Sequence, residues 1–127
     1  MTAETPGRLR FGRKARIKQG RDFARLRQDG SRVIVGCLIA NWRPLPSPSS
    51  SRLGVVTSAR IGGAVVRNRA RRLLRESFRL HQFELVRPID LVLVARGSIV
   101  GKDYRAVEKD FLVTLRRAGL LKSDSRQ

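Results

Sequence analysis

The sequence predicts a single α+β domain in which helices pack on a four-stranded mixed sheet, in the order αβββαβα. Three observations support this prediction. Short apolar segments interrupted by glycine and proline fill residues 32–58, as in a series of strands. Two longer segments, 64–82 and 104–118, repeat apolar residues at the spacing of a helix. The nearly continuous apolar run at 89–95 is typical of an interior strand covered on both faces.

The chain of 127 residues has room for one domain with a modest core. Residues 1–16 are rich in arginine and have no apolar periodicity, so we expect a mobile basic arm that can neutralise phosphate. We expect the folded domain to span residues 17–119. The last residues, 120–127, are expected to form a frayed tail.

The first helix is expected over about residues 19–28. Phe23 and Leu26 share one of its faces, and Gly30 is placed to end it in the left-handed conformation. At the other end of the chain, Asp103 is placed to cap the last helix and Gly119 to end it.

Three strands are expected after the first helix, over residues 32–35, 37–43 and 53–58. Gly36 allows a bend or a bulge between the first two. The loop at 44–51 is built mainly from proline and serine and cannot join a sheet ladder.

The helix at 64–82 has two chemically different faces when its residues are placed at intervals of about 100°. The apolar arc contains Val66, Ala70, Leu73, Leu74, Ser77 and, at its edge, Leu80. The opposite arc contains Arg67, Asn68, Arg71, Arg72, Arg75 and Arg79. We call this second arc the arginine ridge.

Four arginines of the ridge, from Arg67 to Arg79, follow one another at i,i+4 spacing, where like charges destabilise a helix. Glu76 is the only acid near them and can pair with Arg72. A solvated face normally mixes acids and bases, so a merely solvated face is the less favoured interpretation. Because arginine binds phosphate through two hydrogen bonds, a phosphate backbone is the expected partner.

Gly62 and Gly63 precede this helix, and two interpretations of them remain open. Glycines here leave the first N–H groups of the helix uncapped, so that, with Arg60 and Arg67 nearby, the turn can seat a phosphate. Alternatively, the turn requires a positive φ that glycine adopts without strain. The two interpretations are compatible.

Lysine and arginine outnumber aspartate and glutamate by 28 to 10, and the formal net charge is +18. Nucleic acid is therefore the leading class of partner. The aromatic content of 6% argues against an extended platform for base stacking. An anionic membrane surface is the alternative, but no amphipathic helix offers an apolar face large enough to insert.

The first residues lack the apolar run of a signal peptide, and no segment is long and apolar enough to span a membrane. Cys37 is the only cysteine, which permits no internal disulfide and suits a reducing cytoplasm. We expect Cys37 to be a small buried residue on a strand.

The sequence predicts neither a catalytic site nor a metal site in this chain. His81, the only histidine, has no cysteine or acid at ligand spacing and is expected to be structural. The ten acids are scattered, without the pairs that hydrolysis by acid–base or metal catalysis requires.

The run from Ser58 to Arg79 resembles the signature helix of the protein subunit of bacterial ribonuclease P. That family has a Gly-x-Ala-Val-x-Arg-Asn-Arg core, paired basic residues and an Arg-Glu-x-Phe-Arg ending. Residues 62–69 match the core and residues 75–79 match the ending. The resemblance extends more weakly to Asp22-Phe23 and to the strand at 89–96.

The resemblance implies a ribosomal protein S5 domain 2-like sandwich whose β-α-β crossover is left-handed, whereas sequence rules alone favour a right-handed one. It implies a cytoplasmic ribonucleoprotein in which a catalytic RNA subunit removes the 5′ leader from precursor tRNA. That RNA positions Mg²⁺ and the attacking water, so the chain itself contributes no catalytic residue. Neither a membrane nor a further protein partner is implied.

The resemblance also assigns roles to residues. Those expected to contact the RNA subunit are Arg60, Arg67, Asn68, Arg69, Arg71, Arg72, Arg75 and Arg79. Phe23 and Arg27 on the first helix are expected to line the cleft for the leader, together with Asn41 or its neighbour Trp42 on the second strand. Arg27 and Asn41 stand where some members have aromatic residues, which favours phosphate contact over stacking.

Two other classes of protein remain to be distinguished. Composition alone is equally compatible with a small ribosomal protein that binds RNA without processing it. A DNA-binding recognition helix would need side chains that read base edges, and Asn68 is the only candidate on the ridge.

Overall fold

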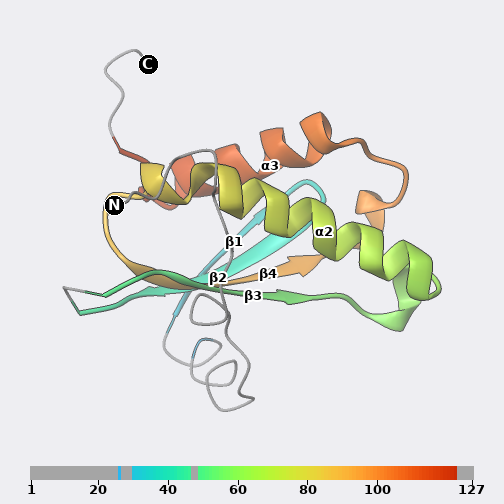
Figure 1. Cartoon of the computed structure of the whole chain (residues 1–127), viewed down its shortest axis with the longest axis horizontal. Helices are drawn as coiled ribbons and strands as arrows, with labels where there is room; N and C mark the ends of the chain where they lie inside the picture. Colours follow the sequence, from blue (N-terminus) through green and yellow to red (C-terminus); the bar gives the residue numbers. More distant parts are fainter. Residues whose placement is uncertain (1–25, 27–29, 47–48, 123–127) are drawn as a thin grey trace, which may run out of the picture.

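The computed structural model describes Leu26 and residues 30–46 and 49–122 (Figure 1). Its strands and long helices are β1 (Ser31–Val35), β2 (Leu38–Pro44), β3 (Arg52–Val56), α2 (Ala64–His81), β4 (Ile89–Ala95) and α3 (Tyr104–Arg117). Three short 3-10 helices connect them, namely η3 (Ala59–Ile61), η4 (Gln82–Glu84) and η5 (Gly97–Ile99). The expected basic arm, and the expected first helix apart from Leu26, lie outside the described residues.

The four strands form one mixed sheet in the order β1-β2-β4-β3. β2 pairs antiparallel with β1 and with β4, and β3 pairs parallel with β4. β4 therefore has a neighbour on each side, and every residue of it except Val94 is buried. This is the interior strand that its apolar run predicted.

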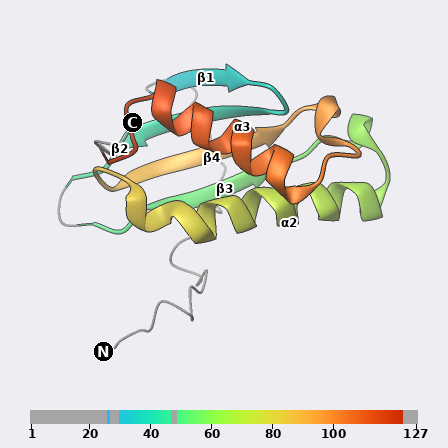
Figure 2. The same ribbon diagram turned by 90° about the horizontal axis from the view of Figure 1, so that it is seen from above.

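Helices α2 and α3 lie side by side on one face of the sheet, α2 over the β3 edge and α3 toward β1 (Figures 1 and 2). The chain leaves β3, returns through α2 and enters the neighbouring parallel strand β4. Viewed from the helices, this crossover is left-handed (Figure 2). It confirms the expectation from the resemblance and departs from the right-handed rule.

The main core fills the space between the sheet and the two helices. Because side chains alternate along a strand, Leu91 and Leu93 of β4 face the helices and share a buried cluster with Phe78 of α2 and Phe111 of α3. Val92 points the other way and packs with Leu26. We call the side of the sheet that carries Val92 the distal face.

Glycine is required at position 30 because a side chain there would clash with neighbouring backbone, and not because the backbone adopts a positive φ. Its amide donates to the Leu26 carbonyl at 2.9 Å, but its φ lies outside the left-handed range, so the expected conformation was wrong. A Cβ added at Gly30 would lie 2.5 Å from the carbonyl oxygen of Leu26 and 2.7 Å from that of Trp42. Any side chain at position 30 would therefore clash with the backbone of Leu26 and of Trp42.

Gly36 and Cys37 form a two-residue turn that joins β1 to β2. Gly36 adopts a φ of 54°, as tight hairpin turns require, so the expected bend or bulge is a hairpin. Cys37 is fully buried as expected, but it lies in the turn and not on a strand. Its amide donates to Asp110 of α3 at 3.0 Å, which fixes the hairpin to that helix.

The end of the domain extends beyond residue 119. Gly119, with a φ of 73°, ends α3 as expected and turns the chain back. Leu120 is buried, and Leu121 forms an antiparallel bridge with Leu85. The expected frayed tail therefore does not begin at residue 120, because its first residues bury apolar surface and make backbone hydrogen bonds.

Candidate nucleic-acid interface

Helix α2 follows its expected bounds closely and turns most of the arginine ridge away from the core. Its buried residues are Ala70, Leu74, Ser77 and Phe78. Phe78 lies beyond the predicted apolar arc, and it is buried because α2 packs against both the sheet and α3. The buried sector is consequently wider than the sequence suggested.

This wider sector divides the ridge into two groups. Arg67, Arg71, Arg75 and Arg79 are half-buried, whereas Asn68 and Arg72 are exposed. Arg69, which the resemblance already named as an RNA contact, is also exposed, although its position on the helix lies outside the arginine ridge.

Arg71 is held in place by neutral partners. Its Nη1 atom donates to Oγ1 of Thr57, directly after β3, at 2.7 Å, and its Nη2 atom donates to the amide oxygen of Asn68. Because neither partner is charged, these contacts orient the guanidinium of Arg71 without neutralising it. Such ordering reduces the entropy that a phosphate contact would otherwise cost.

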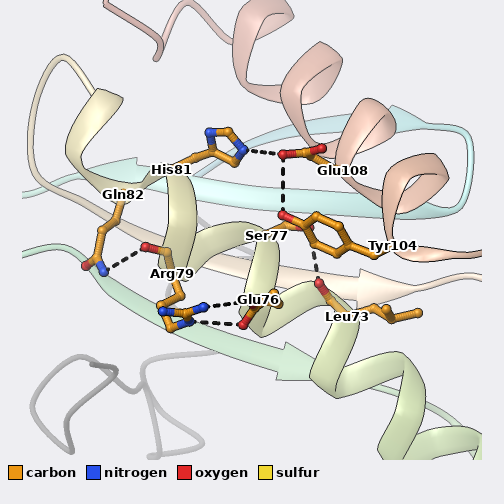
Figure 3. Close-up of polar contacts among 8 residues, drawn as sticks. All are labelled: Leu73, Glu76, Ser77, Arg79, His81, Gln82, Tyr104 and Glu108. Carbon is orange, nitrogen blue, oxygen red and sulfur yellow. Dashed lines mark hydrogen bonds and ion pairs between the residues drawn. The ribbon is translucent and has the colours of Figure 1, made fainter. Parts of the chain in front are cut away.

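Glu76 pairs with Arg79 and not with Arg72, which corrects the sequence prediction. The Arg79 guanidinium donates to both carboxylate oxygens of Glu76, at 2.6 and 3.0 Å (Figure 3). The hydrogen bond from Arg79 lowers the pKa of Glu76. Across residues 30–46 and 49–122, no carboxylate pairs with Arg67, Arg69 or Arg72, so the uncompensated charge lies toward the start of α2.

The start of α2 shows the positive φ that one interpretation of the glycine pair requires and the uncapped amides on which the other depends. Gly62 has a φ of 148°, and a Cβ there would lie 2.9 Å from the Val66 side chain. Gly63 has an ordinary φ of −74° and serves as an N-cap without a side-chain hydrogen bond, so the first amides of α2 stay uncapped. Ser58 accepts a hydrogen bond from the Arg60 amide at 3.1 Å and caps η3. Strand β3 therefore ends at Val56, two residues before its expected end.

The distal face receives only one of the two candidate leader residues of β2. Asn41 pairs with Arg32 of β1 and Val92 of β4, and it lies on the distal face. Trp42 points to the opposite side and packs against the main core, so it cannot line the same surface. Neighbouring residues of a strand face opposite ways, so Asn41 and Trp42 are alternatives for two different surfaces. Phe23 and Arg27 lie outside the described residues.

The distal face also holds an ion cluster that the sequence analysis did not predict. The buried Asp90 carboxylate accepts from Nε and Nη2 of Arg52 at 2.8 and 2.7 Å, and Nη2 of Arg43 lies 3.5 Å from it. Two arginines around one acid leave a net positive charge on this face. Asp90 is the one polar residue in the apolar run of β4. Because a buried acid requires a cation beside it, this residue could have indicated an ion pair from the sequence alone.

His81 joins the end of α2 to α3. Its Nδ1 atom lies 2.8 Å from a carboxylate oxygen of Glu84. Its Nε2 atom lies 2.7 Å from a carboxylate oxygen of Glu108, which Tyr104 also contacts (Figure 3). Two carboxylates can be satisfied together only by the imidazolium form, in which both nitrogens donate. His81 is therefore the structural residue that the sequence predicted.

This arrangement predicts a pH-dependent contribution to stability. Burial lowers the pKa of His81, but the hydrogen bonds to Glu108 and Glu84 outweigh burial and raise it above its usual value. Because the pKa of His81 is higher in the folded protein than in the unfolded chain, the charged imidazole stabilises the fold fully at pH values below the unfolded-state pKa. This stabilisation is lost as the pH rises through the folded-state pKa. We expect His81→Gln to cost about 1 kcal/mol at pH 6 and much less at pH 9.

Because His81 is the only histidine, a proton NMR titration reports its pKa directly. Glu108→Gln should lower that pKa by removing one acceptor. A titration midpoint at or below the ordinary value of about 6.5 would contradict the charged clamp.

The described residues contain no group of three or more histidine, cysteine, aspartate or glutamate side chains that could hold a metal ion. Burial, followed by the nearby Asp110 carboxylate, raises the pKa of Cys37 to about 12, so its thiol is not a nucleophile at neutral pH. Among the helices of the described part, none has the length and apolar character required to cross a bilayer.

The fold and the surface of α2 define a small basic α+β protein with a helix suited to binding phosphate. A model of the family described as Ribonuclease P matches residues 11–119, and the chain therefore belongs to the ribonuclease P protein family.

Known proteins agree with this assignment. The "Ribonuclease P protein component" of Syntrophomonas wolfei is 34% identical over 108 residues, which cover 85% of this chain and 90% of that protein. The component from Clostridium novyi is 33% identical over 106 residues, which cover 83% of this chain and 94% of that protein.

Solved structures of the family have the same fold. The RNase P protein of Staphylococcus aureus has a TM-score of 0.78 at 25% identity, covering 85% of this chain and 98% of that one. The protein from Thermotoga maritima has a TM-score of 0.72 at 26% identity, and the match covers 80% of this chain and 96% of that one. A further S. aureus structure is titled as a mutant with defective mRNA degradation activity.

Proposed function

We propose that this chain is the RNA-binding protein subunit of ribonuclease P and assists a catalytic RNA in removing the 5′ leader from precursor tRNA. The observation that carries this proposal is that, among the described residues, no carboxylate pairs with Arg67, Arg69 or Arg72 of α2, in a chain of net charge +18. A helix surface of this kind is stable when a polyanion neutralises it.

In this proposal the two basic surfaces contact different RNAs. The RNA subunit contacts the arginine ridge, together with Arg69 and with Arg60 beside the uncapped start of α2. The leader follows the distal face, where Asn41 and the arginines around Asp90 offer hydrogen-bond donors. Each surface reduces repulsion between the two RNA backbones.

The chemistry in this proposal belongs to the RNA. Mg²⁺ is coordinated by hard oxygen ligands, and the described residues offer no cluster of carboxylates for it. We therefore assign the Mg²⁺ ions and the attacking water to the RNA partner. The cytoplasm is the proposed compartment, because precursor tRNA and a single reduced cysteine are both compatible with it.

Leader removal at low Mg²⁺ tests the proposed function. The purified chain is added to the catalytic RNA subunit and a precursor tRNA carrying a leader, and the mature 5′ end is measured. We expect the chain to restore cleavage that the RNA alone performs poorly under these conditions. RNA binding without restored cleavage would support the ribosomal-type alternative instead.

A nuclease activity of the chain alone is not favoured. Cleavage of RNA by general acid–base catalysis needs a free base, and histidine is the usual one. Both ring nitrogens of His81 already face carboxylates. Cleavage of precursor tRNA by the chain freed of all RNA would overturn the proposal.

A further inference from the structure

A groove of about 620 Å³ lies at the end of α2, between η4, the start of β4 and the segment before β3. Its wall includes Phe83 and Val86, whose side chains are 65% and 45% exposed. Such a volume is typical of sites for small ligands, and Phe83 offers an exposed aromatic ring on the wall of the groove. The proposed function does not use this groove.

The charge around the groove is positive. Arg87 and Lys122 line it, and none of its described lining residues is acidic. Ser51 accepts a hydrogen bond from the Ile89 amide at 2.9 Å, which leaves its hydroxyl proton available to an acceptor in the groove. The negative end of the α2 dipole lies close to the groove, and Arg79 and His81 in the last turn of α2 already face carboxylates, so the positive charge at the groove comes from Arg87 and Lys122.

Backbone hydrogen bonds hold the walls of the groove in place. The Lys122 amide donates to the Glu84 carbonyl at 2.8 Å, and the Val86 amide donates to the Leu120 carbonyl at 2.8 Å. On the other side, the Leu45 amide donates to the Pro88 carbonyl at 3.0 Å. A ligand would therefore meet a largely formed site, which reduces the cost of binding.

The groove continues the arginine ridge. Gln82 lines the groove, and its side-chain amide donates to the carbonyl of Arg79, the last arginine of the ridge, at 3.2 Å (Figure 3). An RNA strand that follows the ridge toward the end of α2 would reach Phe83 within one further helical turn.

We propose that this groove binds one nucleotide of single-stranded RNA, with its base stacked on Phe83 and its phosphates contacting Arg87 and Lys122. The proposal rests on the proposed function, because the strand must first be held by the ridge. A single aromatic ring provides one stacking position, which agrees with the low aromatic content of the chain.

The test measures binding of the full chain to a fluorescent oligoadenylate of about 12 nucleotides over a range of salt concentrations. Phe83→Ala should weaken binding at least about fivefold, since stacking is lost, and should leave the salt slope unchanged. Phe83→Trp should retain the affinity. Arg87→Ala should reduce the salt slope by about one.

Val100→Ala is the matched control, because Val100 is also about half exposed and lies after η5, away from the groove. In addition, RNA containing 5-iodouridine should crosslink to the peptide that carries Phe83. If Phe83→Ala binds RNA like Val100→Ala and no such crosslink forms, the proposal is wrong.

Two further outcomes separate the groove from the proposed function and from other occupants. If Phe83→Ala is neutral while loss of Arg67 and Arg71 weakens binding, the groove proposal fails and the proposed function stands. If both are neutral, the proposed function fails. If Phe83→Ala abolishes self-association in sedimentation without changing RNA affinity, the occupant is a second copy of the chain, and the nucleotide proposal is overturned.

Discussion

Replacing Arg67 and Arg71 together by alanine is expected to weaken binding of the ribonuclease P RNA subunit by roughly 10- to 100-fold near physiological salt. Both side chains lie where α2 leaves the core, and Arg71 is oriented by Thr57 and Asn68. Each phosphate contact releases about one counterion. The slope of log affinity against log salt should therefore fall by about two.

A filter-binding or fluorescence titration over several salt concentrations measures both quantities. Arg116→Ala is the charge-matched control, since it removes an exposed arginine near the end of α3. Arg71→Lys keeps the charge but loses the forked geometry. This single substitution should therefore lower the affinity while leaving the salt slope nearly unchanged. Unchanged affinity and slope in the double variant would exclude the ridge as the RNA surface.

Asp90→Ala is expected to destabilise the fold by about 2–3 kcal/mol. The Asp90 side chain is only 1% exposed, and its carboxylate neutralises parts of Arg52 and Arg43 that are themselves partly buried. Removing it leaves two cations close together on the distal face. The expected loss is below that for a fully buried pair because the two arginines retain some contact with water.

Urea unfolding monitored by circular dichroism measures this loss as a shift in the midpoint at constant slope. Glu76→Gln is the matched control, because it removes a carboxylate from a more exposed pair with Arg79 and should cost less than about 1 kcal/mol. Equal effects of the two substitutions would show that the Asp90 cluster is not a structural element of the sheet.

Elements that bury one clear face were predicted well. The bounds of β4 agree with its apolar run, and Asp103 caps α3 by accepting from the Ala106 amide at 2.9 Å, as its position suggested. The same holds for α2, whose two faces differ strongly in polarity. Periodicity reports these elements because each one contacts the core along a single stripe.

The candidate site was predicted in part. The ridge follows from local spacing on one helix, so its cations could be named from the sequence. The partner of Glu76 could not, because Arg72 and Arg79 are both within reach of it on the helix. The face occupied by Asn41 or Trp42 could not be assigned either, since a shift of one residue in a strand moves a side chain to the other face.

What the sequence by itself determined is the class of protein: a basic α+β domain of the ribonuclease P family, with arginines concentrated on one helix. Only the tertiary structure decided the surroundings of those arginines, the joining of Arg43 and Arg52 through Asp90, and the groove beside Phe83. The reason is physical. Helical periodicity is a property of neighbouring residues, whereas ion pairs across a sheet and grooves between elements depend on how distant segments pack.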